Sequence, residues 1–178
     1  GLNNRHHLET CLNEAIASAR EIGQSGYVLF IDMDDFKIIN DAYGHDYGDA
    51  ILKEVSAFLK EHFGNDGSIF RFGGDEFVIL LDPARAADIY TVVNGLLTRA
   101  QLPWHVLDRT FYCTLSIGVV RFPEGREDNR EIIKNADIAM YQAKKMGKNN
   151  YVFYTSTLDN DSIARAEMEK AMRESIEP

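Results

Sequence analysis

Two groups of carboxylates stand beside apolar segments in this sequence. Asp75 and Glu76 follow the glycine pair Gly73 and Gly74 within RFGGDEFVIL. Asp32 ends the apolar segment YVLFID, and further aspartates follow in the next stretch of chain. Like charges held close together either raise each other's pKa or recruit a cation. If the segment that ends at Asp32 lies beside the glycine-containing turn, these carboxylates meet.

Such a site would have the chemistry of a hard cation. An all-oxygen ligand set without a neighbouring group of Cys or His suits Mg²⁺ or Mn²⁺ and not zinc. Each group has an ordinary alternative, because a Gly-Gly turn followed by Asp-Glu is more often a solvated turn. An aspartate-rich loop also usually faces solvent. The two groups together, each beside a buried strand, favour a metal site.

Helices are expected on several segments around these groups. FKIINDAYG predicts a short helix that ends at Gly44, and Pro83 is expected to open a helix that runs through Leu97. Gly147 is expected to close the helix that contains ADIAMYQAKK. Apolar residues at helical spacing predict further helices over 5–22, 49–63 and 161–176.

Short apolar segments between these helices predict strands. A hairpin is expected around Gly73 and Gly74, because turn residues separate two apolar runs there. The other expected strands are 27–32, 104–107, 111–119 and 151–154. Helices alternate with strands, but one strand pair is a direct hairpin. The order therefore predicts an α+β fold with a mixed central β-sheet covered by helices.

Length and composition narrow the class of protein. The 178 residues fit one domain, and 45% hydrophobic and 26% charged residues are typical of a globular protein. The net charge of −9 argues against a nucleic-acid partner. No apolar run is long enough to span a membrane, and no signal peptide is visible.

Cys11 and Cys113 are expected to be buried thiols, which favours a reducing, cytoplasmic compartment. The start at GLNNRHHLET, without methionine, indicates a fragment of a longer protein that missing segments could anchor to a membrane.

The motifs together resemble the GGDEF family, to which diguanylate cyclases belong. The signature GGDEF stands at 73–77, and LSIGVV (115–120) and ADIAMYQAKKMGKN (136–149) fit later family motifs. The family's first motif fits Asp32-x-Asp34-x-Phe36-Lys37-x-x-Asn40-Asp41-x-x-Gly44-His45-x-x-Gly48-Asp49. The resemblance implies a GGDEF domain over 1–155, followed by a helix or linker over 156–178.

The resemblance also implies a fold and a reaction. The fold would be a polymerase-palm-like, nucleotide-cyclase-like sheet with a ferredoxin-like core. The reaction would be the condensation of two GTP into cyclic di-GMP with release of pyrophosphate, in bacterial second-messenger signalling. Each domain would hold one GTP, so a second GGDEF domain would be needed as a transient partner.

The family's metal and catalytic residues carry over to the two carboxylate groups. Asp32, the main-chain carbonyl of Met33 and Asp75 match the metal ligands for Mg²⁺ or Mn²⁺. Asp32, Asp75 and Glu76 are the expected catalytic residues. Glu76 would complete a second metal position or orient the attacking 3′-hydroxyl, and the sequence does not separate these roles.

Asn40 and Asp49 match the family's guanine-reading residues. A carboxylate can accept hydrogen bonds from guanine N1–H and the exocyclic amine together, whereas adenine presents an acceptor at N1. The ordinary alternative for Asp49 is the N-cap of the helix that follows it. Phe36 belongs to the same expected GTP-binding set.

Lys37, Lys144 and Lys148 match residues that contact the triphosphate. For Lys144 and Lys148 the alternative is a basic helix C-terminus that complements the helix dipole. Gly73 and Gly74 would let the backbone approach the nucleotide, and their alternative role is a tight turn.

Three features depart from the family or extend beyond it. Lys148 stands where the family usually has arginine, so one bidentate phosphate contact is lost. The family's product-binding Arg-x-x-Asp is replaced by Gly64-Asn65-Asp66-Gly67, so feedback inhibition through that site is not expected. The segment SIARAEMEKAMRESIEP resembles the helix that leads into EAL phosphodiesterase domains. This last feature favours an alternative function, a GTP-binding regulatory module that controls a neighbouring EAL domain.

Overall fold

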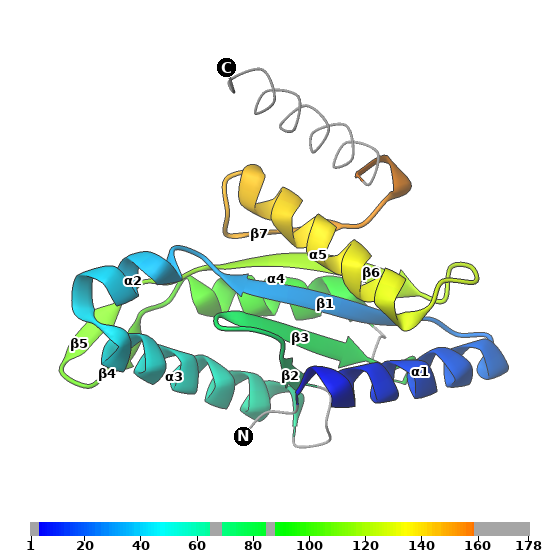
Figure 1. Cartoon of the computed structure of the whole chain (residues 1–178), viewed down its shortest axis with the longest axis horizontal. Helices are drawn as coiled ribbons and strands as arrows, with labels where there is room; N and C mark the ends of the chain where they lie inside the picture. Colours follow the sequence, from blue (N-terminus) through cyan, green and yellow to red (C-terminus); the bar gives the residue numbers. More distant parts are fainter. Residues whose placement is uncertain (1–3, 65–68, 85–87, 159–178) are drawn as a thin grey trace, which may run out of the picture.

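A computed structural model describes residues 4–64, 69–84 and 88–158 of the chain (Figure 1). Its helices and strands alternate along most of the sequence. In chain order they are α1 (Arg5–Ile22), β1 (Gly26–Met33), α2 (Phe36–Tyr43), α3 (His45–Phe63), β2 (Ile69–Arg71), β3 (Glu76–Leu81), α4 (Ile89–Ala100), β4 (Trp104–Val106), β5 (Arg109–Phe111), β6 (Leu115–Phe122), α5 (Asn129–Lys145) and β7 (Asn150–Phe153).

The main sheet has five strands in the order β2-β3-β1-β6-β7. Strand β1 is central and pairs antiparallel with both β3 and β6, and β2 pairs antiparallel with β3. Strand β7 runs parallel to β6 at the other edge. The expected mixed sheet is therefore confirmed, and its centre is the strand that carries Asp32.

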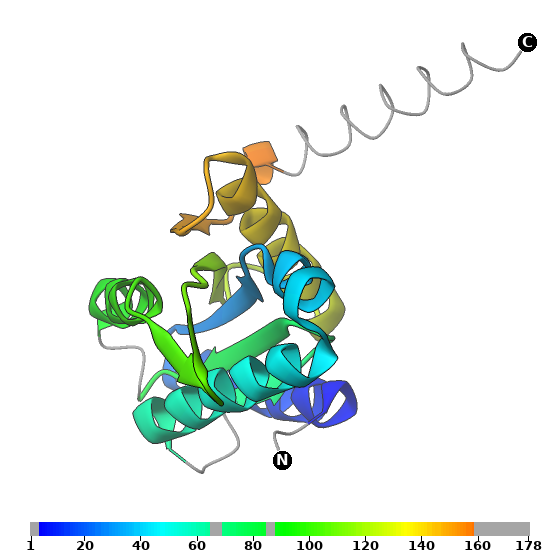
Figure 2. The ribbon, with the colours of Figure 1, turned by 90° about the vertical axis from the view of Figure 1, so that its left-hand side faces the viewer.

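Successive residues of β1 face opposite sides of the sheet and enter two separate cores. Leu29, Ile31 and Met33 pack in a core with residues of α2, α3 and α4. Val28 and Phe30 pack in a second core with residues of α1 and α5. Helices thus cover both faces, with α5 on the side opposite α3 and α4 (Figures 1 and 2). By the same alternation, Asp32 belongs to the face that α5 covers.

Helix α5 lies very close to β6 because a glycine stands at the crossing. A Cβ atom at Gly118 would collide with backbone atoms of Ala136 and Met140. The backbone of α5 cannot yield as a flexible side chain could. Glycine at this position therefore sets how closely α5 approaches the sheet.

Two predicted helix starts differ from the structure. Helix α3 begins at His45, directly after Gly44, and Asp49 lies inside it. The N-cap alternative for Asp49 is therefore wrong. Helix α4 begins at Ile89 with Asp88 as its N-cap, while Pro83 lies in a turn before it. Proline fits a turn as well as a first helical position, so its presence alone did not distinguish the two.

The strand expected over 111–119 is two strands. Strand β5 ends at Phe111 and pairs with β4 in a separate two-stranded ribbon, and β6 begins at Leu115. The ribbon is held by Trp104, whose indole N–H donates to the Cys113 carbonyl at 3.1 Å. The apolar pattern continues through the break, so the pattern did not reveal it.

The helix expected over 161–176 and most of the segment 156–178 lie outside the described residues. Within the described ranges, no helix has both the length and the apolar character that a membrane crossing requires. Cys11 and Cys113 are both free thiols, as expected. Cys113 is buried, but Cys11 is only partly buried, so the expected burial is wrong for Cys11.

Candidate active site

The sheet register brings the two carboxylate groups together. Asp32 lies opposite Glu76 on β3 and opposite Ser116 on β6. The next backbone amide, of Met33, donates to the Asp75 carbonyl at 3.2 Å. The expected neighbours Asp32 and Asp75 therefore meet where β1 ends, and Glu76 faces the same side of the sheet as Asp32.

The turn between β2 and β3 is closed by backbone bonds and by an arginine. The amides of Phe72 and Gly73 donate to the Glu76 carbonyl at 2.9 and 3.4 Å. Arg71 donates to the carbonyls of Gly73 and Gly74, the latter at 2.7 Å.

Neither glycine of this turn has a left-handed φ, so the turn conformation itself does not require them. A Cβ atom at Gly74 would meet nothing within 4 Å, whereas one at Gly73 would lie 2.7 Å from a Glu76 carboxylate oxygen. The structure therefore leaves open space beside Gly74, next to the carboxylates.

Asp32 is a buried carboxylate in an acidic environment. Its burial raises the pKa of the carboxyl group to about 6, and the nearby charge of Asp75 acts in the same direction. A hydrogen bond from Lys144 opposes this shift without cancelling it. The local structure thus favours a cation beside Asp32.

Two further carboxylates extend this acidic surface. Burial and then the charge of Asp32 raise the pKa of Glu76, and the charge of Asp137 adds to this effect. Burial likewise raises the pKa of Asp137. Sequence reasoning missed Asp137. Asp137 lies seven residues before Lys144, so both residues are on one face of α5. This spacing could have identified Asp137 as a residue near the site.

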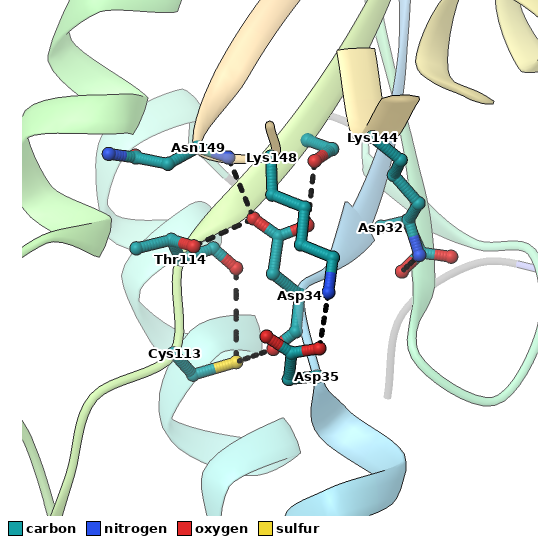
Figure 3. A network of polar contacts seen from close by, with 9 residues as sticks. Asp32, Asp34, Asp35, Cys113, Thr114, Lys144, Lys148 and Asn149 are labelled. Atoms are coloured by element: carbon teal, nitrogen blue, oxygen red, sulfur yellow. Dashed lines mark hydrogen bonds and ion pairs between the residues drawn. The ribbon is translucent and has the colours of Figure 1, made fainter. Parts of the chain in front are cut away.

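Asp34 has a role that its place in an acidic stretch did not indicate. Its buried carboxylate accepts hydrogen bonds from the Thr114 hydroxyl at 2.7 Å and from the backbone N–H of Asn149 at 2.9 Å (Figure 3). It also accepts one from the Ser116 hydroxyl at 2.6 Å. The Cys113 thiol donates to the Asp34 carbonyl at 3.3 Å. Asp34 thereby joins the β1–α2 loop to β6 and to the turn after α5.

The two lysines near the end of α5 contact carboxylates at the end of β1 and in the loop that follows it. The Lys144 ammonium lies 2.6 Å from Asp32 Oδ1, and the Lys148 ammonium lies 2.5 Å from Asp35 Oδ1 (Figure 3). Lys144 lies in the last turn of α5, as the helix-dipole alternative also requires. Lys148 lies beyond the end of the helix, so that alternative is wrong for Lys148.

The ligand set fits a divalent cation in its chemistry. Asp32, Asp75 and the Met33 carbonyl offer only oxygen atoms, which Mg²⁺ and Mn²⁺ prefer. Asp32 already binds a cation, the Lys144 ammonium, which stands in for a metal ion at that carboxylate. In the described ranges no three Asp, Glu, His or Cys side chains are gathered as a ready ligand cluster.

The expected base-reading residues lie on α2 and α3. The Asn40 side-chain oxygen is buried, and it has no hydrogen-bond partner within the described ranges. It packs against Gly48, where a Cβ atom would collide with it. Asp49 is exposed and lines two open grooves on α3, of about 620 Å³ toward Arg71 and about 560 Å³ toward β4. An unpaired buried acceptor beside an exposed carboxylate fits a polar ligand.

The N-terminus of α2 faces the same loop. Its N-cap residue Asp35 has a left-handed φ of 58° and makes no side-chain capping bond. The first amides of a helix lack partners within that helix and attract anions. Lys37 is exposed in this first turn, whereas the Phe36 ring is buried in the core. A phosphate group would fit here through backbone amides and Lys37, with Phe36 as support.

The chain matches known proteins along most of its length. Residues 1–150 match the family model described as diguanylate cyclase, GGDEF domain. The chain is 35% identical over 176 residues to the bifunctional diguanylate cyclase/cyclic di-GMP phosphodiesterase MucR of Pseudomonas aeruginosa. This alignment covers 99% of this chain and 26% of MucR. It is 32% identical over 176 residues to the cyclic di-GMP phosphodiesterase NbdA of the same organism. That alignment covers 99% of this chain and 22% of NbdA. The chain therefore spans about a quarter of the length of these relatives.

A solved structure confirms the expected fold class. The crystal structure of the GGDEF domain of TpbB from Pseudomonas aeruginosa superimposes with a TM-score of 0.80 at 33% identity. The match covers 87% of this chain and 98% of that domain. The mixed sheet and its helices are thus those of a GGDEF domain.

Proposed function

The chain belongs to the GGDEF family of diguanylate cyclase domains, and we propose that it condenses two molecules of GTP into cyclic di-GMP. In each of two equivalent steps, the 3′-oxygen of one GTP attacks the α-phosphorus of the other. The bond to the β-phosphate breaks, and pyrophosphate leaves. The products are one cyclic di-GMP and two pyrophosphates.

One observation carries this proposal: the register that places Asp32, Asp75 and Glu76 at adjoining strand ends, beside the first turn of α2, which has no side-chain cap. Asp32, Asp75 and the Met33 carbonyl would hold Mg²⁺ or Mn²⁺. When bound, the metal would neutralise the triphosphate charge and stabilise the negative charge that develops in the transition state. The backbone amides of α2, together with Lys37, Lys144 and Lys148, would orient the phosphates.

The base would be read on the α3 side of the site. Asp49 would accept hydrogen bonds from guanine N1–H and the exocyclic amine, and the Asn40 side-chain amide would donate to an acceptor on the base. Adenine would leave Asp49 facing a lone pair, and an unmet polar group in such a pocket costs about 1–3 kcal/mol. Glu76 lies opposite Asp32 and can accept a hydrogen bond from the attacking hydroxyl or complete a second cation position.

The alternative is a regulatory module that binds GTP without turnover and controls a neighbouring phosphodiesterase domain. The similarity to NbdA, a relative named as a phosphodiesterase, favours this alternative. The intact signature and the converging carboxylates favour the enzyme.

One measurement tests the reading of the base, and a second measurement separates the two functions. Calorimetry with a non-hydrolysable GTP analogue and with the matching ATP analogue tests the base-reading residues. Asp49→Ala is expected to reduce the preference for guanine at least tenfold, and equal affinities in the unmodified chain would contradict the assignment. Incubation with GTP and Mg²⁺ tests turnover, since the regulatory module would bind GTP and form no cyclic di-GMP.

A further inference from the structure

The two lysines near the end of α5 are held by carboxylates of very different exposure. In the Lys144–Asp32 pair the side chains are 27% and 9% exposed. In the Lys148–Asp35 pair they are 42% and 53% exposed. Asp32 is fixed on the central strand among other carboxylates, so removing its counter-ion leaves a buried, unpaired charge. The pair with Asp35 is a surface pair, and such pairs contribute little.

Lys144 and a divalent metal are both cations that would bind the Asp32 carboxylate. Asp32 Oδ1 accepts a hydrogen bond from the Lys144 ammonium at 2.6 Å, so a metal ion at this carboxylate would be repelled by the ammonium unless the ammonium moved away. Pairing of β1 on both sides fixes the backbone of Asp32, so its carboxylate stays at the end of this strand. The lysine stem is flexible, and its ammonium can move to another acceptor. A phosphate brought beside the same loop is such an acceptor.

We propose that Lys144 is an exchangeable counter-ion that holds the metal position of Asp32 until nucleotide arrives. This inference rests on the proposed function, in which Asp32 is a metal ligand. Before nucleotide binds, the Lys144 ammonium neutralises Asp32 and disfavours a metal ion there. When nucleotide binds, the ammonium pairs with a phosphate instead, and the Asp32 carboxylate can then bind the metal. Nucleotide and metal therefore bind with positive coupling, and by linkage each strengthens the other equally.

Binding of Mn²⁺ without nucleotide tests the exchange directly. The free ion is measured by electron paramagnetic resonance at pH 8, for the unmodified chain and for Lys144→Met. The methionine variant is expected to bind Mn²⁺ at least fivefold more tightly, in the range typical of coupled sites. Lys144→Arg keeps a cation on Asp32 and is expected to bind Mn²⁺ as weakly as the unmodified chain.

Lys148→Met is the matched control. It removes the same charge a few residues away, but the ion pair that it breaks is the exposed pair with Asp35. Its Mn²⁺ affinity is expected to stay within twofold of the unmodified chain. A gain as large as that of Lys144→Met would mean that general charge, and not exchange at Asp32, is responsible, and would overturn the inference.

A further pair of variants separates the inference from the proposed function. Asp32→Asn in the Lys144→Met background is expected to abolish the gained Mn²⁺ affinity. Asp32→Asn alone is expected to weaken binding of the Mn²⁺ complex of a non-hydrolysable GTP analogue. If Asp32→Asn weakens that binding while Lys144→Met gains no Mn²⁺ affinity, the proposed exchange of Lys144 is wrong and the metal-ligand role of Asp32 is retained. If Asp32→Asn does not change binding of that complex, the exchange and the metal-ligand role are both wrong. Circular dichroism of each variant shows that it is folded.

Discussion

At the scale of residues, Asp32, Asp34 and Asp35 stand within four positions and have three different environments. Asp32 faces α5 and pairs with Lys144, Asp34 is enclosed by hydroxyl and amide donors, and Asp35 is exposed with Lys148. In the sequence they form one acidic stretch. Only the strand register and the return of the chain after α5 separate them. The position of Asp32 beside Asp75 could be predicted from the apolar segment that it ends, and the supporting role of Asp34 could not.

The raised pKa of Asp32 predicts how stability depends on pH. The folded pKa is about 6 and the ordinary value is 3.8. The stability associated with Asp32 is therefore fully present below pH 3.8 and is lost as the pH rises through 6. Asp32→Asn stays neutral, so its unfolding free energy should exceed that of the unmodified chain by roughly 1–3 kcal/mol at pH 7.5 and match it near pH 4. Urea unfolding at both pH values checks this, and an advantage that shrinks as the pH rises would contradict it.

Gly48→Ala tests the placement of Asn40. An added Cβ collides with the Asn40 side-chain oxygen and displaces it. Affinity for a GTP analogue should fall about tenfold, equivalent to ~1.4 kcal/mol. Stability should change by less than about 1 kcal/mol, because alanine favours the helix while the contact disfavours it. Calorimetry and urea unfolding measure the two effects, and unchanged nucleotide affinity would show that the Asn40 position does not matter for binding.

At the scale of elements, the hairpin and the main helices were predictable because each has a local signal. Gly73 and Gly74 separate two apolar runs, and that pattern is confirmed as the turn between β2 and β3. The break between Phe111 and Leu115 has no such signal. It arises because the ribbon of β4 and β5 packs separately on α3, a contact between segments distant in sequence. Apolar pattern reports burial and does not say against which element a strand is buried.

The crossing of β6 and α5 gives a prediction for stability. Gly118→Ala places a methyl group against the backbone of Ala136 and Met140, so the helix must move outward. Such overpacking typically costs about 1–3 kcal/mol. The movement would also carry Lys144 away from Asp32.

Gly95→Ala is the matched control, since a Cβ atom there meets nothing within 4 Å. Gly95 lies inside α4, so this variant should be slightly more stable, by about 0.5–1 kcal/mol. Urea unfolding of the two variants should therefore show changes of opposite sign. Equal effects would mean that the close approach at Gly118 is not what determines stability.

At the scale of the whole molecule, the net charge of −9 opposes the approach of two copies. The proposed reaction nevertheless requires two loaded domains that face each other. The rate of cyclic di-GMP formation at saturating GTP should therefore grow with the square of protein concentration in dilute solution. It should also rise with moderate salt, which screens the repulsion. A dilution series with sedimentation measurements checks both, and a linear rate from a confirmed monomer would contradict the two-domain reaction.

In the proposed reaction, the carboxylates at the strand ends support the condensation of GTP. The most direct measurement is mass spectrometry of the products after incubation with GTP and Mg²⁺, on the unmodified chain and on Asp75→Asn, at a protein concentration where dimers form. Cyclic di-GMP and pyrophosphate are predicted in a ratio of one to two for the unmodified chain, with at least a hundredfold loss in the variant. Tight GTP binding without any cyclic di-GMP, even in enforced dimers, or full turnover by Asp75→Asn, would contradict the account.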